Sequence, residues 1–292
     1  MTLDQLRCLC AIAETGGFRL ASERMRRSQP AVSQQIKALE RELGHSLVER
    51  RAGTLTPVGQ RMYERARHIL VEAESLVREM DDFGEGQGRV LRVGTSDTTA
   101  LYALPPVMSA FSKRMPEARL MLVNRSSDAI AEHVARGDLD LGIVTLPVAQ
   151  KVLEQRPLFE QALVLVTPQN HPLATQSATT LDALRHEPML LLDAATRTGS
   201  LLRSYFQEAG FTPQVVLDTG SFEVIKRYVA EGIGVSFLPR AVVTSADTAL
   251  AVVQVADVPS VRIGAVWRSE AYQTRVERTF LQIAEEMLQP MQ

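Results

Sequence analysis

Apolar side chains recur at steps of three and four through the first fifty residues. This spacing is the period of helices that bury one side, and it predicts several short helices. The first ends at Gly16-Gly17, the second covers about 20–25, and the third runs from about 28 to 43. The segment 47–55 is expected to form a small hairpin or wing. The pattern therefore predicts a compact helical domain.

A long helix is predicted next, from Thr56-Pro57 to about residue 83. A threonine N-cap followed by proline in the first turn is typical of a helix start. Apolar residues then recur at alternating four- and three-residue steps over about three heptads, as in paired helices. We interpret this seam as the contact with a partner helix, and packing on its own domain is the alternative. Its members are Met62, Ala66, Ile69, Ala73, Leu76, Met80 and Phe83.

The pattern changes after Gly84, Gly86 and Gly88, which predict a flexible hinge. Short apolar runs now alternate with helical segments, which indicates an α/β region with mainly parallel sheets. Its length of about two hundred residues allows two linked subdomains. Strands are expected near 90–93, 120–123, 139–144, 163–166, 189–192, 215–217, 235–238, 250–255 and 263–267. Helices are expected up to about 115, between 123 and 139, and at 200–209, 222–231 and 272–288.

Charge separates the two ends of this 292-residue chain. The net charge is −2, but residues 1–68 carry twelve Lys/Arg against seven Asp/Glu. A basic head on an acidic body favours a polyanion as the partner of the head alone. The sequence has no apolar run long enough to span a membrane and no export signal, so a cytoplasmic protein without membrane contact is expected. The two cysteines, Cys8 and Cys10, face different directions on a helix and predict neither a disulfide nor a metal site.

The third helix has two contrasting faces. Val32, Ile36, Leu39 and Leu43 form one apolar stripe, which can pack on the preceding helices while the opposite face stays free. A polar, basic helix face of this kind fits the DNA major groove, where Gln and Ser can read base edges and Lys and Arg can hold phosphates. The alternative is an ordinary amphipathic surface helix. The candidate DNA-binding residues are Gln29, Pro30, Ser33, Gln34, Lys37 and Arg41, with Arg50 and Arg51 just after the helix.

Five stretches resemble the LysR-type transcriptional regulators. The N-terminal ones are 18–25 (FRLASERM), 28–40 (SQPAVSQQIKALE) with 43–44 (LG), and 55–59 (LTPVG). Residues 137–143 (GDLDLGI) and 231–239 (EGIGVSFLP) resemble the sensor domain of the same family. In this family the early residues of the recognition helix contact bases, which here implies Gln29, Pro30 and Ser33.

The resemblance implies an α+β multidomain fold with double-stranded DNA as partner. Its parts would be a winged helix-turn-helix domain at 1–57, a dimerisation helix and hinge at 58–88, and an effector-binding α/β domain at 89–292. The last part would resemble periplasmic binding proteins of type 2. Subdomain 1 would cover about 89–163 and 268–292, and subdomain 2 about 164–267. The family also implies a homodimer, as the seam does, and its assembly into a homotetramer; action on RNA polymerase is implied by the family alone.

Several strand-to-helix turns are rich in small hydroxyl residues, and such turns with free N–H groups suit anions. The resemblance implies that Ser96, Thr98, Thr145 and Thr198 line a cleft between the subdomains. Arginines there would pair with a carboxylate or sulfur oxyanion, and an aspartate would hold an amino group. We therefore expect a small anion or zwitterion as effector, with helix capping as the alternative role of each hydroxyl. The candidate residues are Ser96, Asp97, Thr98, Thr99, Arg125, Thr145, Arg197, Thr198 and Ser221.

Two other protein classes, a metabolic enzyme and a solute-binding protein, are the alternatives to a regulator. A metabolic enzyme would need a catalytic constellation, but the chain has no Gly-rich phosphate loop, nucleophile elbow or metal-spaced His/Cys cluster. A solute-binding protein of a transport system would need an export signal and would leave residues 1–83 unexplained. We therefore expect a regulator that is not an enzyme, with no catalytic residue, metal or cofactor.

Overall fold

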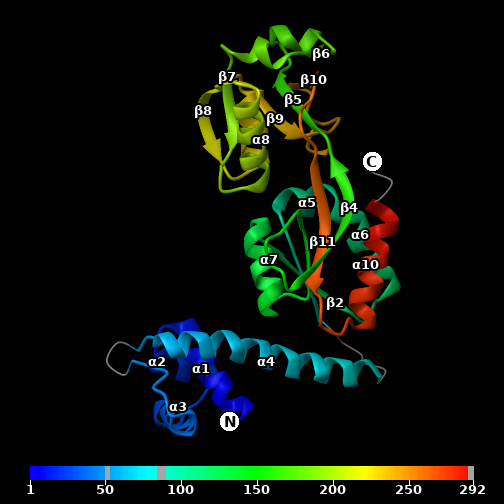
Figure 1. Cartoon of the computed structure of the whole chain (residues 1–292). Coiled ribbons are helices and arrows are strands. Elements are labelled where there is room, and N and C mark those ends of the chain that lie inside the picture. The colour runs from blue at the N-terminus through cyan, green and yellow to red at the C-terminus, as the bar shows by residue number, and fades with distance from the viewer. Residues whose placement is uncertain (50–52, 84–89, 289–292) are drawn as a thin grey trace. The chain divides into compact units, whose positions relative to one another are not determined.

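The computed structural model describes residues 1–49, 53–83 and 90–288 (Figure 1). It forms two compact units, Met1–Glu85 and Gly86–Gln292, which are described separately. Predicted features that fall on the remaining residues lie outside this description. They are Arg50, Arg51 and Ala52 of the wing and Gly84, Gly86 and Gly88 of the hinge.

The described residues of the first unit form four helices: α1 (Leu3–Thr15), α2 (Phe18–Met25), α3 (Gln29–Leu43) and α4 (Pro57–Phe83). The predicted helices are confirmed, and local signals set their ends. Ser28 caps α3 by accepting a hydrogen bond from the Ala31 N–H, and Gly44 ends it in the left-handed conformation at φ 71°. Arg26 adopts the same conformation, φ 52°, in the tight turn between α2 and α3.

The core of this unit is built from the predicted apolar stripes of α1 and α3, with Val32, Ile36 and Leu39 almost fully buried. The stripe of α3 is shorter than predicted, because Leu43 at its end is 37% exposed. Both cysteines are buried in α1 but in separate clusters. Burial raises the pKa of the Cys10 thiol to about 12, so the thiol stays protonated at neutral pH.

The helix α4 is joined to α3 through the base of the wing. Val48 and Leu55 form an antiparallel bridge, and the Glu40 carboxylate on α3 accepts hydrogen bonds from the Leu47 and Val48 N–H groups at 2.8 and 3.2 Å. Gly59 lies in the first turn of α4, directly against the Leu47 backbone. A Cβ atom there would sit 1.9 Å from the Leu47 carbonyl oxygen, so only glycine fits this contact.

The predicted seam of α4 serves two purposes. Near its start, Met62 and the buried Ala66 pack against Leu6 and Cys10 of α1, so this part follows the alternative of packing on its own domain. Further along, the apolar side chains are left uncovered. Ile69, Leu76, Val77 and Met80 are 40%, 58%, 60% and 55% exposed.

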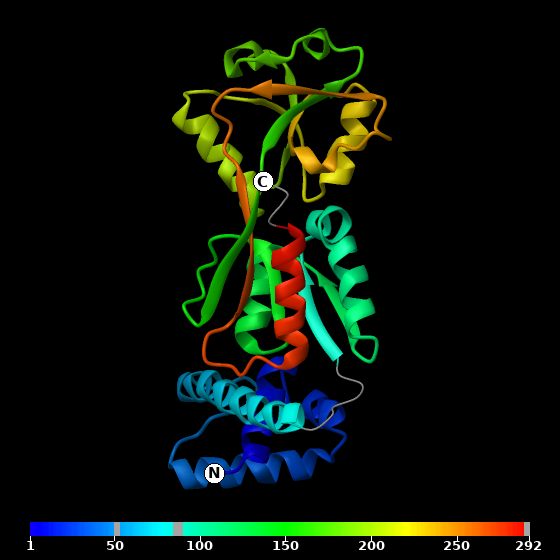
Figure 2. The same cartoon turned by 90° about the vertical axis from the view of Figure 1, so that its right-hand side faces the viewer.

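The described part of the second unit contains two sheets and a strand pair (Figure 2). The five-stranded sheet has the order β2-β1-β3-β11-β4, the four-stranded sheet has the order β6-β10-β5-β9, and β7 pairs with β8. The strands are β1 (Val90–Thr95), β2 (Arg119–Asn124), β3 (Leu141–Thr145), β4 (Leu153–Gln161), β5 (Leu163–Pro168), β6 (Ala178–Thr179), β7 (Pro188–Leu192), β8 (Gln214–Thr219), β9 (Ser236–Pro239), β10 (Leu250–Val255) and β11 (Val261–Arg268).

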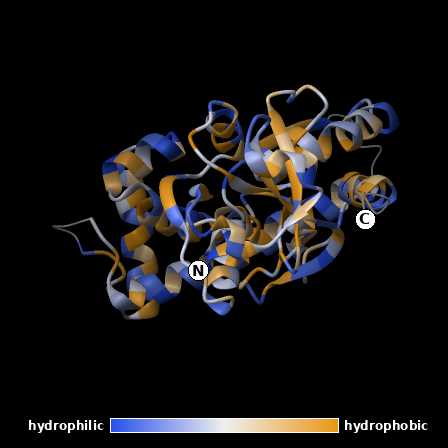
Figure 3. Ribbon diagram, turned by 90° about the horizontal axis from the view of Figure 1, so that it is seen from above, coloured by the Kyte–Doolittle hydropathy of each residue, from blue (hydrophilic) through white to orange (hydrophobic). Residues whose placement is uncertain are grey.

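Helices cover both faces of the five-stranded sheet, with α7 on one side and α6 and α10 on the other (Figure 1). Phe111 of α6 and Phe280 of α10 meet edge to face there. The helix ribbons alternate between apolar and polar colours in Figure 3, as expected of helices that bury one side. The helices are α5 (Asp97–Tyr102), α6 (Leu104–Arg114), α7 (Ser127–Arg136), α8 (Arg197–Glu208), α9 (Phe222–Ala230) and α10 (Arg275–Leu288).

Three sequence predictions are wrong in this unit. The sheets are mixed rather than mainly parallel, because β11 returns from the second sheet without a crossover helix and pairs antiparallel with β3 and β4. Residues 261–267, which were predicted in the second subdomain, therefore pair with strands of the five-stranded sheet. The strand β4 was missed, because only part of Leu153–Gln161 is apolar. The single helix expected up to residue 115 is two helices, α5 and α6, and Pro105 and Pro106 begin the second.

Candidate functional site

The polar face of α3 is exposed, and its side chains have no partner within the residues that the structure describes. Gln29, Pro30, Gln34, Lys37 and Arg41 are exposed, and Ser33 is partly exposed. Among the described residues, neither Lys37 nor Arg41 has a carboxylate partner. The face is therefore a preformed surface that carries two free positive charges and several hydrogen-bonding groups.

Basic residues that precede α3 are placed differently. Arg24 and Arg27 form ion pairs with Glu14 and Asp4 of α1, at 2.7 and 2.6 Å. These pairs connect α1 to the segment that leads into α3. Such exposed pairs contribute little to stability. However, the two carboxylates partly neutralise the two arginine charges, which would otherwise attract a phosphate.

All nine predicted effector residues line one cavity of about 320 Å³ in the second unit. The cavity lies between the five-stranded sheet and the strand pair β7-β8 with its helices. Its walls come from the ends of β1 and β3 and from the starts of α5, α7, α8 and α9, so backbone N–H groups of several helices converge on it. These residues are Ser96, Asp97, Thr98, Thr99, Arg125, Thr145, Arg197, Thr198 and Ser221.

The predicted hydroxyl groups in this cavity are either engaged or unengaged, and Thr99 is engaged because it accepts a hydrogen bond from the Ser96 hydroxyl at 3.2 Å. Ser96 and Ser221 are N-caps of α5 and α9, so their side chains are engaged as in the capping alternative. Within the described part of the chain, the hydroxyls of Thr98, Thr145 and Thr198 have no hydrogen-bond partner. The unengaged hydroxyls are therefore free to bind a ligand.

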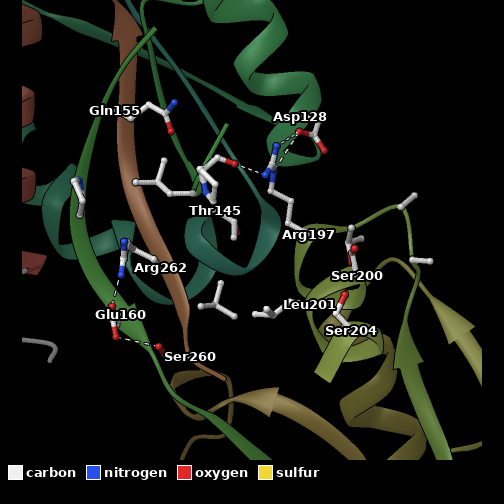
Figure 4. Close-up of a pocket in the computed structure, with 17 residues that line it drawn as sticks. Asp128, Thr145, Gln155, Glu160, Arg197, Ser200, Leu201, Ser204, Ser260 and Arg262 are labelled. Carbon is white, nitrogen blue, oxygen red and sulfur yellow. Dashed lines mark hydrogen bonds and ion pairs between the residues drawn. The ribbon is translucent and has the colours of Figure 1, made fainter. Parts of the chain in front are cut away.

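The two predicted arginines also differ in whether they already have a carboxylate partner. Arg197 forms an ion pair with Asp128 and also donates to the Pro147 carbonyl (Figure 4). This contact crosses the cleft, because Arg197 begins α8 while Asp128 is in α7. Arg125 donates to the backbone oxygen of Asn124 at 2.8 Å and has no carboxylate partner among residues 1–49, 53–83 and 90–288. It is the cation that remains available to an anionic ligand.

Sequence reasoning missed a second contact across the cleft. Tyr102 of α5 donates a hydrogen bond to Glu223 of α9, and the Lys226 ammonium donates to the Tyr102 hydroxyl at 2.9 Å. Burial alone would lower the pKa of Lys226, but its bonds to Tyr102, Asp247 and Glu223 outweigh this and raise it. These residues are far apart in sequence, so no local signal could have found them. Asp128 could have been suspected, since it directly follows the hydroxyl pair Ser126-Ser127.

The cleft continues past Arg197 into a wider cavity of about 850 Å³ (Figure 4). One wall carries Ser200, Leu201 and Ser204 of α8. The facing wall carries Glu160 of β4 and Arg262 of β11, which pair with each other at 3.3 Å. The Arg197–Asp128 contact lies where the two cavities meet.

The described residues hold no group of three metal-ligating side chains. None of the described helices is long and apolar enough to cross a membrane.

Comparison with known proteins identifies both units. Residues 3–60 match the family of bacterial regulatory helix-turn-helix proteins of the LysR type, and residues 84–289 match the LysR substrate-binding domain. The chain is 34% identical over 245 residues to a probable hydrogen peroxide-inducible genes activator of Streptomyces viridosporus, covering 83% of this chain and 78% of that protein.

Two solved structures have the same fold. A cysteine-to-aspartate variant of full-length OxyR from Pseudomonas aeruginosa superimposes with a TM-score of 0.78 at 27% identity, covering 97% of this chain and 94% of that one. Full-length CbnR, a structure solved in complex with its target DNA, has a TM-score of 0.66 at 24% identity, covering 98% of this chain and all of that one.

Proposed function

Because the chain belongs to the LysR family of bacterial transcriptional regulators, we propose that its α3 face reads the operator and its cleft binds the effector. The protein is a DNA-binding transcriptional regulator with an effector-binding domain. Its relatives are regulators rather than enzymes. The observation that carries the proposal is the division of α3 into a buried apolar stripe and an exposed polar face.

In the proposed DNA complex, α3 enters the major groove. Gln29, Pro30 and Ser33, near its start, contact base edges, and Gln34 joins them. Lys37 and Arg41 hold phosphates along the groove, where their free charges displace counterions. Arg50 and Arg51 stay predicted phosphate contacts from the sequence.

Two copies are proposed to pair through the exposed apolar part of α4. Ile69, Leu76 and Met80 are too exposed for a helix that functions alone, and burying them against a second copy would remove apolar surface from water. Such a dimer places two α3 helices in successive major grooves, about one helical turn or a multiple apart. Effector domains would pair as well to give a tetramer, which would act on RNA polymerase.

The proposed effector is a small anion or zwitterion bound in the 320 Å³ cavity. Arg125 and the free hydroxyls of Thr98, Thr145 and Thr198 support this class of ligand. One relative is named for induction by hydrogen peroxide. The effector unit of this chain contains no cysteine, since both cysteines lie in α1, so it has no thiol with which to sense that oxidant.

The test of DNA reading is selection of bound duplexes from a random pool, followed by Gln29→Ala and Ser33→Ala. Each variant should lose discrimination between the selected and random duplexes, by about 1–3 kcal/mol for each base contact that is removed. Gln35→Ala is the matched control, because Gln35 lies about 160° around α3 from the polar face and should change nothing. Unchanged discrimination in Gln29→Ala and Ser33→Ala would remove these two residues from the readout.

A further inference from the structure

We propose that Gln161, at the crossover between the two subdomains, donates a hydrogen bond to an oxyanion of the effector. This proposal rests on the proposed function of the cleft and goes further, because it names a ligand-contacting residue and the chemical group that the residue recognises.

Gln161 is 7% exposed, and its side chain forms part of the wall of the 320 Å³ cavity. Its amide nitrogen is buried and has no hydrogen-bond partner in the described part of the chain. Buried polar groups are nearly always hydrogen-bonded, so an amide that is left unpaired beside a cavity is most simply explained by a missing partner. Because this nitrogen has almost no accessible surface, a ligand acceptor would reach it when the cleft closes and the side chain turns toward the ligand.

The surroundings define the class of the acceptor. Arg125 and the unpartnered hydroxyls of Thr98, Thr145 and Thr198 line the same cavity. An amide N–H₂, a guanidinium and several hydroxyls together suit a carboxylate, phosphate or sulfate, which accept several hydrogen bonds at once.

The position of Gln161 would link binding to movement. It is the last residue of β4 and pairs in register with Val261, the first residue of β11. Only Ala162 separates it from β5 in the other sheet. A ligand held here lies at the strands about which the subdomains would turn on closure.

The strand β4 offers a matched control, because it carries a second glutamine whose amide is fully used. Gln155 donates to the Val148 carbonyl and accepts from the Val148 N–H, both at 2.9 Å. Replacing Gln155 by methionine should therefore lower the melting temperature of the unliganded protein. The same change at Gln161 should leave it unchanged or raise it, since no hydrogen bond is lost and a buried polar group is removed.

The experiment compares wild type, Gln161→Met and Gln155→Met in the full chain. Melting temperatures are measured without ligand and with acetate, succinate, benzoate, phosphate or sulfate, each against sodium chloride at equal ionic strength. At least one oxyanion should stabilise wild type, and Gln161→Met should bind it about tenfold more weakly, which corresponds to about 1.4 kcal/mol.

Three outcomes would overturn the proposal. Gln161→Met could melt earlier than wild type without ligand, which would make the amide structural. It could bind the stabilising oxyanion as tightly as wild type, or no oxyanion could stabilise wild type. Duplex binding by the same samples is measured separately, so a loss of regulator function would be seen independently of these results.

Discussion

The α3 face and the effector cleft differ in how their charges are used. On α3, Lys37 and Arg41 have no carboxylate partner among the described residues, so the face is ready for a polyanion without rearrangement. In the cleft, Arg197 is held by Asp128, and Tyr102 by Glu223, across the space between the subdomains. An external surface needs only exposure, whereas an internal cleft must satisfy its buried groups when no ligand is present. A ligand in the cleft therefore competes with contacts that already exist.

The largest expected effect is a change that destabilises the DNA-binding unit and leaves the effector unit intact. Gly59→Ala places a Cβ atom against the Leu47 carbonyl oxygen, a backbone atom that cannot move aside. We expect the free energy of unfolding of the first unit to fall by about 1–3 kcal/mol, with DNA binding strongly reduced. Calorimetry should show the transition of the effector unit unchanged. Gly220→Ala, where nothing lies within 4 Å of the new Cβ, is the control.

The contribution of each basic residue near α3 to DNA binding should depend on whether it already has a carboxylate partner. Lys37→Ala and Arg41→Ala should each reduce the magnitude of the slope of log affinity against log salt by about 0.9, because each removes one proposed contact with a phosphate. Arg24→Ala and Arg27→Ala should change the slope less, since both arginines already pair with acidic residues of α1. Fluorescence anisotropy across a salt series measures this, and equal slopes for all four variants would contradict the distinction.

Removing the carboxylate partner of Arg197 should leave this arginine available to an anion, as is proposed for the cations of α3. Asp128→Asn removes the charge that holds Arg197, so oxyanions should bind more tightly, by several-fold. The stability should change by only about 0–1 kcal/mol, because the Asp128 side chain is 54% exposed. Titration calorimetry measures the binding, and Glu160→Gln in the pair with Arg262 is the control. A weaker affinity in Asp128→Asn would show that the ion pair is part of the site.

The smallest effect concerns pH. Burial alone would raise the pKa of Asp247, but hydrogen bonds from Thr244 and Lys226 lower it below 3.8. Its contribution to stability is thus present above that value and is lost as the pH falls through the lowered pKa. The pKa of Lys226 is raised above 10.5, so its contribution is lost only as the pH rises past that raised value. Stability of the effector unit should therefore depend on this cluster only at the extremes, and Lys226→Met should flatten both limbs of a melting-temperature profile.

The sequence by itself determined the helices of the first unit and the free face of α3. Their apolar period, the Ser28 cap and the Gly44 terminus act within a few residues, so they can be read along the chain. It also placed nine hydroxyl and charged residues at strand and helix ends, and such ends meet at one edge of a sheet.

Only the tertiary structure decided how those nine residues are used. The contact of Arg197 with Asp128 spans 69 residues, and the contact of Tyr102 with Glu223 spans 121. The antiparallel return of β11 beside β4 brings Gln161 to the wall of the cavity. Such pairings depend on which distant segments pack together, and this packing cannot be predicted from the local spacing of residue types.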